Sequence, residues 1–527
     1  MKKFLLALTV VLLVALQSVA ACTIFAVSKG ATADGITITS HTCDSTSDDL
    51  RLWVIPSFEA GNRDLVLDGR AGADYSKFPE VKDYGRNGMV LGTLNYDKPT
   101  NQYLHAMYSF INDKGVSCNE STCWYWSYTE QDQKLQEAFA KEEGIVDCYM
   151  IQDYALETCS TAREAVEKMG ALVEEYGWYG TNSCECVCVA DGNEAWVVEF
   201  YGGRIWVAVR VPEGAVFVCA NRARINHFDF DDPENYLCTP DIREWAIDNG
   251  LWDGKSDFIP CRIFCPRSDA YSVNREWSAL MQLQPSLNLD RLDPDHDLNW
   301  PLFAYPEEPV TVDTIYKISS SNYEGTEIDV TKTIEAGAFG NPLNSNNTLR
   351  TINCYRCTYI EIAAVDATLP EEARCLAYFG WGAPNTTYLT PVFASQKTLP
   401  DFFGRGLRSE YDPNSGWWLS EVVQMQAQRN FRAAIEDIKA VRDPKMATVY
   451  EQTKVAQQIA ASMIEVGMKD QAVDYLTAYA NTTANDWFKT WQKLSNALET
   501  KYALGNVNMS VPKEPDAWKA VKDQIVE

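Results

Sequence analysis

The chain has 527 residues, a formal net charge of −27 and a hydrophobic fraction of 46%, with 16 tryptophans. This length and apolar content predict a well-packed globular protein and argue against a largely disordered chain. The strong negative charge argues against nucleic acid and anionic membrane surfaces as partners, because both require a basic patch.

The first residues have the pattern of a secretory signal peptide. Lys2 and Lys3 precede an apolar run over residues 4–16, and Val19 and Ala21 occupy the positions that signal peptidase examines. The run is too short for a permanent membrane helix, and no later stretch reaches the roughly 18 apolar residues that a span requires. The sequence therefore predicts an exported protein, periplasmic or extracellular, without an integral membrane segment.

All 16 cysteines lie beyond this segment, and an exported chain could carry disulfides. Cys184, Cys186 and Cys188 share one face of a predicted strand, but their spacing of roughly 6.8 Å is too wide for a zinc site. We therefore expect no metal and no cofactor. Which cysteines pair in disulfides cannot be deduced from the sequence. Candidate disulfide pairs are Cys118 with Cys123 and Cys354 with Cys357.

The mature chain begins with a predicted hairpin. Residues 22–28 and 36–41 have strand patterns and flank a turn centred near residue 32. In such an antiparallel pair, position 22 lies opposite position 42, because paired residue numbers sum to a constant. His41 and Asp44 are therefore predicted beside Cys22.

Helices and strands alternate in blocks after the hairpin. The period is helical over residues 131–176, with a capping box at Thr161 and Glu164 and a stop at Gly177. Residues 184–221 return to strands and form a meander that ends on Asn221. This order favours an α+β layered body over a doubly wound parallel sheet.

The rest of the chain divides into an irregular part and a helical part. The segment of about 229–309 is rich in Asp, Pro and Trp and predicts irregular structure with short helices. Beyond Tyr411 the pattern predicts a helix that ends at Pro444, followed by helices over 446–467 and 470–504. The expected domains are a signal peptide (1–21), a main domain (22–410) and a helical C-terminal region (411–527).

An exposed N-terminal cysteine carries a thiol and a free α-amine on the same residue. The amine, with a reference pKa of about 7.7 to 8.0, can take the thiol proton near neutral pH, so Cys22 could supply both nucleophile and base. Asp44 and His41 fit the groups needed to hold the amine and to favour thiolate. Asn221 is the first candidate for oxyanion stabilisation, and Asn119 or Thr122 could supply a second donor.

Residues 19–22 also resemble a lipobox, in which the cysteine is the site of lipid attachment. Acylation would block both the thiol and the amine. In that case the protein would be a non-catalytic lipoprotein anchored through Cys22. Asp44 alone could equally be a turn or cap residue, and Asn221 alone a loop residue.

Five segments resemble the bacterial cysteine dipeptidases of the dipeptidase A type, which belong to the N-terminal-nucleophile hydrolase superfamily. The resemblance implies a four-layer αββα sandwich, processing that frees an N-terminal cysteine, and hydrolysis of dipeptides without a metal. The segments cover most of the mature chain in the family's order. They are CTIFAVSKGATADGITITSHTCDS, FINDKGVSCNEST, AWVVEFYGGRIWVAVRVPEGAVFVCANRARI, YEGTEIDVTKTIEAGAFGNP and SGWWLSEVV.

The resemblance assigns roles to individual residues. Cys22 matches the nucleophile, Asp44 the carboxylate that orients the amine, and Asn221 a polar residue at the oxyanion or substrate carbonyl. Arg356 is similar to an arginine that related bile-salt and penicillin amidases keep in their site. Many relatives carry Arg where this chain has His41, and the role of this histidine stays open.

The sequence thus favours an exported dipeptidase that acts on small peptides through Cys22. The alternatives are an N-acyl amidase of the bile-salt or penicillin type and the anchored lipoprotein. A homo-oligomer is compatible with the sequence.

Overall fold

The computed structural model describes residues 22–46, 50–67, 89–124, 129–179, 183–266, 270–345, 349–516, 518–520 and 522. The predicted signal peptide lies outside these described residues.

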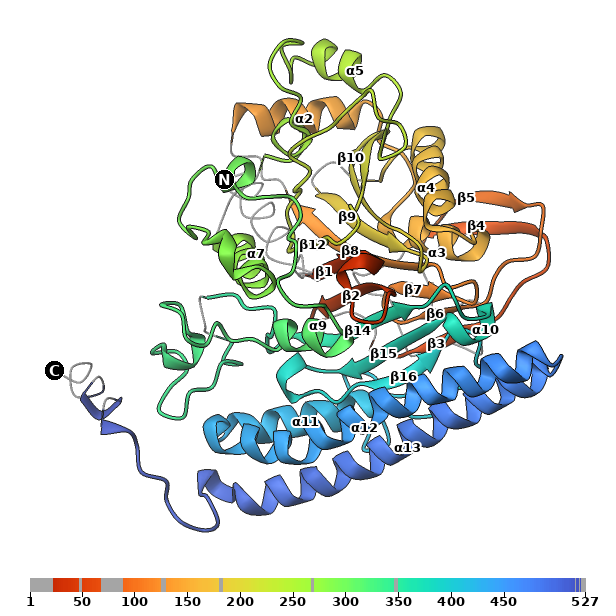
Figure 1. The fold of residues 1–527 in the computed structure, drawn as a ribbon. Coiled ribbons are helices and arrows are strands. Elements are labelled where there is room, and N and C mark those ends of the chain that lie inside the picture. The colour runs from red at the N-terminus through yellow and green to blue at the C-terminus, as the bar shows by residue number, and fades with distance from the viewer. Residues whose placement is uncertain are drawn as a thin grey trace, which may run out of the picture.

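Two antiparallel sheets form the centre of the fold (Figure 1). The six-stranded sheet has the order β12-β1-β2-β14-β15-β16, and the eight-stranded sheet has the order β13-β11-β10-β9-β8-β7-β6-β3. The six strands are β1 (Thr23–Val27), β2 (Thr37–Asp44), β12 (Val216–Cys219), β14 (Cys357–Val365), β15 (Leu376–Trp381) and β16 (Thr390–Phe393). The eight are β3 (Trp53–Ile55), β6 (Tyr103–His105), β7 (Ser109–Asn112), β8 (Ser117–Trp124), β9 (Ser183–Ala190), β10 (Ala195–Gly202), β11 (Ile205–Arg210) and β13 (Tyr236–Cys238), and a separate ribbon pairs β4 (Gly61–Leu67) with β5 (Met89–Tyr96).

The two sheets pack face to face, with β1 and β2 against β8 and β9. Ile24 and Ala26 share one buried cluster with Cys186 and Cys188, whereas their neighbours on β1 belong to another. This alternation follows from the two-residue period of a strand. A buried core therefore fills the space between the sheets.

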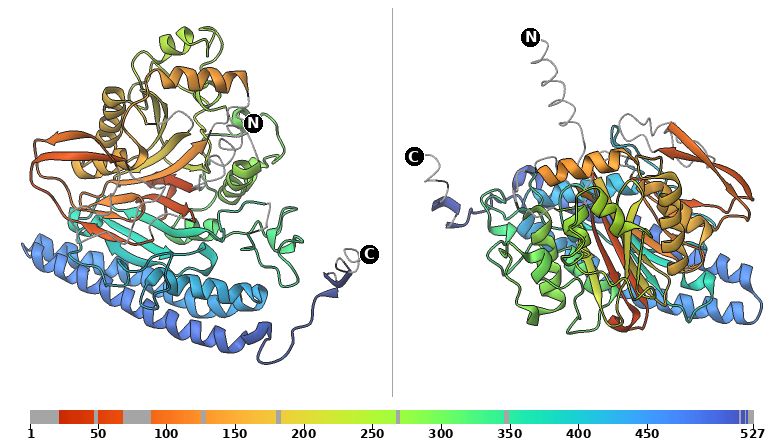
Figure 2. Two further views of the ribbon diagram at one scale, coloured as in Figure 1. Left: turned by 180° about the vertical axis from the view of Figure 1, so that it is seen from behind. Right: turned by 90° about the horizontal axis from the view of Figure 1, so that it is seen from above.

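Helices cover the outer faces of both sheets (Figures 1 and 2). On the eight-stranded sheet these are α3 (Cys148–Thr158) and α4 (Ala162–Tyr176), and on the six-stranded sheet α11 (Gly416–Gln428), α12 (Phe431–Glu465) and α13 (Lys469–Lys501). In Figure 1 and in the left view of Figure 2, α12 and α13 run side by side along the six-stranded sheet. The predicted α+β body with a helical C-terminal region is confirmed.

The hairpin is confirmed, but its register differs by one residue from the prediction. Thr23 pairs with Thr42 and Ile24 with His41. A 3-10 turn over residues 29–31 lies off the centre of the connection and displaces the pairing. Because paired residues and residues two apart point to the same side, Cys22 and His41 lie on one face of the hairpin.

The predicted helix end at Pro444 is wrong. The chain breaks instead at Asn430, and α12 then continues through Pro444 for 35 residues in all. Ile438 and Met446 are buried on either side of the proline, so tertiary packing outweighs the loss of one helical hydrogen bond. Thr161 caps α4 as predicted, and Gly177 ends it with φ 70°.

The segment 229–309 is irregular, as predicted, apart from one longer helix. This helix, α7 (Ala270–Leu283), has 14 residues and contacts β12. The remaining helices of the described chain are α2 (Glu130–Ala140), α5 (Ile242–Asp248), α6 (Pro260–Phe264), α8 (His296–Asn299), α9 (Val312–Ser319) and α10 (Glu371–Arg374).

The 16 cysteines all lie in the part of the chain that the structure describes, where none of them forms a disulfide and 15 are buried. The pair Cys118 and Cys123 is not bonded because residues five apart on β8 point to opposite faces of the sheet. Cys184, Cys186 and Cys188 share one buried cluster, in agreement with their predicted common face.

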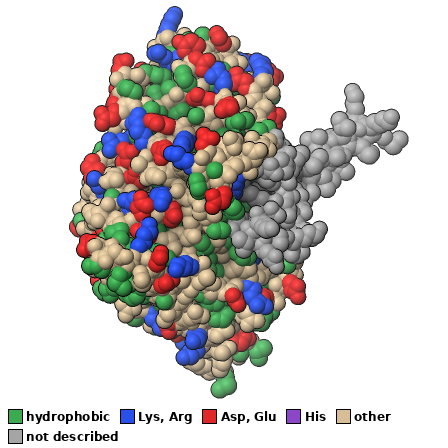
Figure 3. All heavy atoms as spheres, turned by 90° about the vertical axis from the view of Figure 1, so that its right-hand side faces the viewer, with side chains coloured by type: hydrophobic (Ala, Val, Ile, Leu, Met, Phe, Trp, Pro, Cys, Tyr) green, Lys and Arg blue, Asp and Glu red, His purple; other side chains and the backbone are tan. Residues whose placement is uncertain are grey.

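Within the described residues, no helix has the length and apolar character that crossing a bilayer would demand. On the face drawn in Figure 3, acidic and basic side chains are interspersed. Neither sign dominates that face.

Glu199 makes the free energy of unfolding depend on pH. Its carboxylate is buried on β10 and accepts hydrogen bonds from the Tyr201 hydroxyl and the Ile225 N–H. Burial raises its pKa to about 8 from the usual 4.5. Between these values the folded chain holds a proton that the unfolded chain has lost, so this group's contribution to stability falls as the pH rises from about 4.5 to 8.

We expect Glu199→Gln to melt at a higher temperature than the wild type at pH 8, by roughly a few degrees, and at the same temperature at pH 5. The physical reason is that the amide cannot ionise in the buried site. Thermal melts by circular dichroism at both pH values measure the difference, with Glu213→Gln as an exposed control. Equal shifts at both pH values would contradict this origin.

Candidate active site

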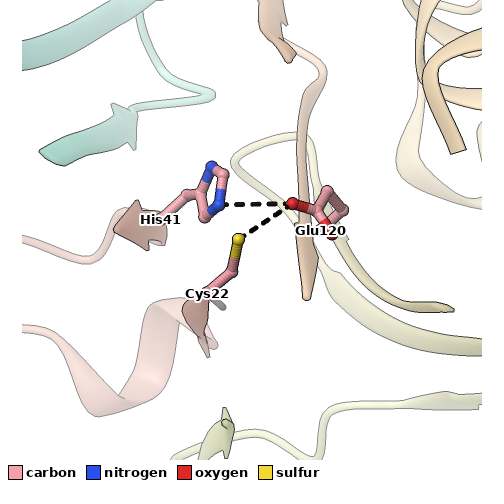
Figure 4. A group of neighbouring side chains, drawn as sticks. All are labelled: Cys22, His41 and Glu120. Atoms are coloured by element: carbon pink, nitrogen blue, oxygen red, sulfur yellow. Dashed lines mark hydrogen bonds and ion pairs between the residues drawn. The ribbon is translucent and has the colours of Figure 1, made fainter. Parts of the chain in front are cut away.

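Three polar side chains meet where the two sheets approach each other (Figure 4). The Cys22 thiol donates to Oε1 of Glu120 at 3.1 Å, and Nε2 of His41 lies 3.4 Å from the same oxygen. Cys22 precedes β1, His41 lies on β2 and Glu120 on β8, so both sheets contribute. None of the three side chains is more than 1% exposed.

Neighbouring residues fix the orientation of this group. The Thr122 hydroxyl donates to Oε2 of Glu120 at 3.3 Å. The His41 ring contacts the edges or faces of Tyr108 and Tyr359, with ring centroids 5.4 and 5.7 Å apart. These contacts leave the imidazole little room to rotate.

The surroundings keep both the thiol and the imidazole uncharged. Burial, followed by a hydrogen bond with Cys43 and the charge of Glu120, raises the pKa of the Cys22 thiol well above its usual range. Burial lowers the pKa of His41 to about 3. A neutral His41 stabilises thiolate less than a cation would, so deprotonation of Cys22 requires another base.

Asp44 lies at the end of β2 and is fully buried. Its Oδ2 forms an ion pair with Arg350, whereas its Oδ1 accepts no hydrogen bond. The negative charge of Asp44 is near enough to contribute to the raised pKa of Cys22. The uncommitted oxygen can therefore accept a further donor in the neighbourhood of residue 22.

Asn221 follows β12 in a left-handed conformation, with φ 64°. Its N–H donates to the Ser121 hydroxyl at 3.0 Å, and its side-chain amide donates to the Thr122 carbonyl at 2.7 Å. Ser121 in turn donates to the Cys22 carbonyl at 3.3 Å. Ser121 therefore links Asn221 to Cys22 through two hydrogen bonds.

Arg275 joins the two segments that flank this site. The guanidinium, on α7, donates to the Cys22 carbonyl at 2.8 Å and to Oδ1 of Asn221 at 2.8 Å. It also donates to the Thr23 hydroxyl at 2.9 Å and to the Ala220 carbonyl at 3.0 Å. Arg275 is fully buried, so it fixes the start of β1 relative to the loop after β12.

The other predicted site residues have different partners. Asn119 donates its side-chain amide to Glu361 rather than toward Cys22. Thr122 contacts the site through Glu120 and also donates to Glu185 at 2.9 Å. Arg356 donates to the Tyr271 hydroxyl at 2.5 Å and is only partly buried.

Sequence reasoning missed three residues of the site. Glu120 stands inside the quoted segment FINDKGVSCNEST, but an acidic residue among polar neighbours carries no pattern of its own. Arg275 comes from the part predicted to be irregular, and Arg350 occupies the position beside Asp44. The sequence signal for the burial of Arg275 is weak: it is a charged residue within the apolar repeat of a helix.

Comparison with known proteins identifies the family. Residues 94–443, two thirds of the chain, match the sequence profile of Peptidase family C69. The chain belongs to this peptidase family. The match includes Asn119, Glu120, Asn221, Arg275 and Arg350, and it begins after the hairpin that carries Cys22.

Several relatives extend the comparison. A protein named probable dipeptidase A from Streptococcus pyogenes is 26% identical over 355 residues, which is 66% of this chain and 71% of the relative. A protein named dipeptidase from Bifidobacterium longum is 27% identical over 299 residues, 54% of each chain. A probable dipeptidase from Salmonella dublin is 24% identical over 410 residues, 75% of this chain and 86% of the relative. The resemblance seen in the sequence is confirmed at the level of the family.

Proposed function

We propose that the protein is an exported dipeptidase whose nucleophile is Cys22, exposed as the N-terminal residue by removal of residues 1–21. Membership of Peptidase family C69 and the names of the relatives support dipeptide hydrolysis. The two facing sheets with helices on both sides support the αββα fold of the N-terminal-nucleophile hydrolases.

The main support for this proposal comes from the surroundings of Cys22. The thiol is buried among polar groups, and one oxygen of the nearby Asp44 is without a hydrogen bond. In the full-length chain residue 22 has a peptide N–H and no base. Cleavage replaces that amide with an amine, which can take the thiol proton, and Asp44 can then orient the resulting ammonium ion.

The reaction begins when the α-amine of Cys22 takes the thiol proton. The resulting thiolate attacks the peptide carbonyl, and the new ammonium offsets the negative charge of Glu120 beside the sulfur. As the C–N bond breaks, the ammonium returns a proton to the leaving amine and a thioester remains. The amine then takes a proton from water, hydroxide attacks the thioester, and the thiol leaves with that proton.

Asn221 is the proposed donor to the oxyanion. One hydrogen of its side-chain amide is committed to the Thr122 carbonyl, which leaves the other for the substrate. Arg275 holds Oδ1 and so fixes the plane of this amide. Such a preorganised donor does not have to reorient as charge develops.

A panel of substrates tests the proposed activity. The protein, purified from an exporting host, is assayed with dipeptides of different side chains, a conjugated bile salt and a penicillin. We expect hydrolysis of dipeptides to exceed that of the two N-acyl compounds. Preferential hydrolysis of either N-acyl compound would assign the amidase function instead, and a lipid on Cys22 by intact-mass analysis would favour an anchored lipoprotein.

We expect Arg275→Met to lower kcat/KM by about 100-fold, since it frees both the Cys22 carbonyl and the Asn221 amide. Most of the loss should fall on kcat, because Arg275 positions the reacting groups rather than the substrate. Arg275→Lys should recover part of the rate, and the surface variant Arg405→Met is the matched control. A folded Arg275→Met protein with unchanged kcat would refute this role.

A further inference from the structure

We propose that Cys22, His41 and Glu120 form a binding site for zinc, and that the bound ion inhibits the enzyme by occupying its thiol. The three side chains proposed here lie 98 residues apart from first to last and meet only through the packing of two sheets.

The donor atoms suit zinc in kind and in spacing. A thiolate, an imidazole and a carboxylate are all ligands that zinc accepts, whereas magnesium and calcium prefer oxygen alone. The three donor atoms lie within 4.8 Å of one another. With Zn–S bonds of about 2.3 Å and Zn–N or Zn–O bonds of about 2.0 to 2.1 Å, tetrahedral ligands stand roughly 3.3 to 3.6 Å apart.

Two of the observed separations are already near that value. The Cys22 sulfur lies 3.1 Å from the Glu120 oxygen, and the His41 nitrogen 3.4 Å from the same atom. Small displacements of these side chains would admit the ion. The site therefore needs no rearrangement of the strands that carry it.

His41 provides an independent indication of a ligand. Its Nε2 is buried and has no hydrogen-bond partner, although it faces the Glu120 carboxylate in Figure 4. Contacts with Tyr108 and Tyr359 hold the ring in this direction. A buried nitrogen atom that makes no hydrogen bond and lies beside a thiol and a carboxylate can coordinate a metal.

The charges and protons of the three side chains also balance when zinc binds. When zinc binds, the Cys22 thiol releases its proton to solvent and a Zn–S bond forms, so that thiolate and carboxylate together offset the two positive charges. In the processed chain the α-amine of Cys22 becomes a fourth ligand and closes a five-membered chelate ring with the sulfur. Binding by the three side chains does not depend on catalysis, but the predicted inhibition rests on the proposed function.

Cobalt substitution tests the site without an activity assay. The purified protein is freed of metal with a chelator and titrated with cobalt(II) and then with zinc chloride. We expect the visible absorption of tetrahedral cobalt together with a sulfur-to-cobalt charge-transfer band, one equivalent per chain, and displacement by zinc. His41→Ala and Glu120→Gln should each weaken zinc binding by more than about 100-fold, while Cys375→Ser, a buried thiol elsewhere, should not.

A second measurement uses the wild type alone and covers variants that fail to fold. Zinc should protect Cys22 from alkylation by iodoacetamide, as measured by peptide mass spectrometry, and excess chelator should restore labelling. Cobalt spectra that persist in folded His41→Ala, or labelling of Cys22 that zinc leaves unchanged, would overturn the proposal. If the cobalt spectrum forms but no dipeptide is hydrolysed, the metal site stands and the proposed function fails.

Discussion

Cys22→Ala should abolish dipeptide hydrolysis, with a decrease in kcat of about 10⁴-fold or more. The substitution removes the sulfur that forms the proposed thioester, whereas the proposed oxyanion donor remains. Steady-state kinetics on protein whose N-terminus has been verified by intact mass measures the loss. Cys22→Ser should retain slight activity, because a hydroxyl is a weaker nucleophile than a thiol near neutral pH.

Cys43→Ala is the matched control. Cys43 is also fully buried, and it contributes to the raised pKa of the Cys22 thiol through a hydrogen bond. The control therefore separates loss of the nucleophile from loss of a neighbouring buried thiol. Unchanged hydrolysis by correctly processed Cys22→Ala would disprove the mechanism, whatever the activity of Cys43→Ala.

The elements around Cys22 were predictable because they depend on local patterns. The alternation of apolar and polar residues identifies the hairpin, and the glycine and capping residues identify α4. The register was not predictable to one residue, since it depends on where the 3-10 turn lies within the connection. That single residue decides whether His41 or Asp44 shares the face of the Cys22 thiol.

The observed register gives the two residues different tasks. His41 lies on the side of the thiol, and Asp44, three residues later on the same strand, lies on the opposite side. The side chain that carries the thiol and the α-amine leave the Cα of Cys22 in different directions. The geometry is thus compatible with His41 beside the sulfur and Asp44 near the amine.

The long-range partners could not be predicted from the sequence. Glu120 meets Cys22 only because β8 packs against β1, and no periodicity links positions so far apart. Arg350 rather than Arg356 pairs with Asp44, and the two arginines stand six residues apart in a segment without a regular period. In such a segment the path of the backbone selects the partner.

A chain with one extra residue before Cys22 should be nearly inactive although it keeps the thiol. Two forms are compared: one begins at Cys22, and the other carries a single additional glycine. The extended form has its amine one residue away, so the nitrogen of Cys22 is again a peptide N–H without basicity. Since general-base catalysis contributes about 10² to 10⁴-fold, we expect kcat/KM to fall by a factor in that range.

Thermal melts and alkylation of Cys22 show whether the extended form is folded and keeps its thiol. Asp44→Asn is introduced into both forms, and its effect on the rate shows whether Asp44 acts through the amine of Cys22. If Asp44 acts by orienting the amine, Asp44→Asn lowers the rate of the form that begins at Cys22 and changes the extended form little. Equal activity of the two wild-type forms would mean that another group deprotonates the thiol. Glu120, which already accepts the hydrogen bond from that thiol, would then be the nearest base.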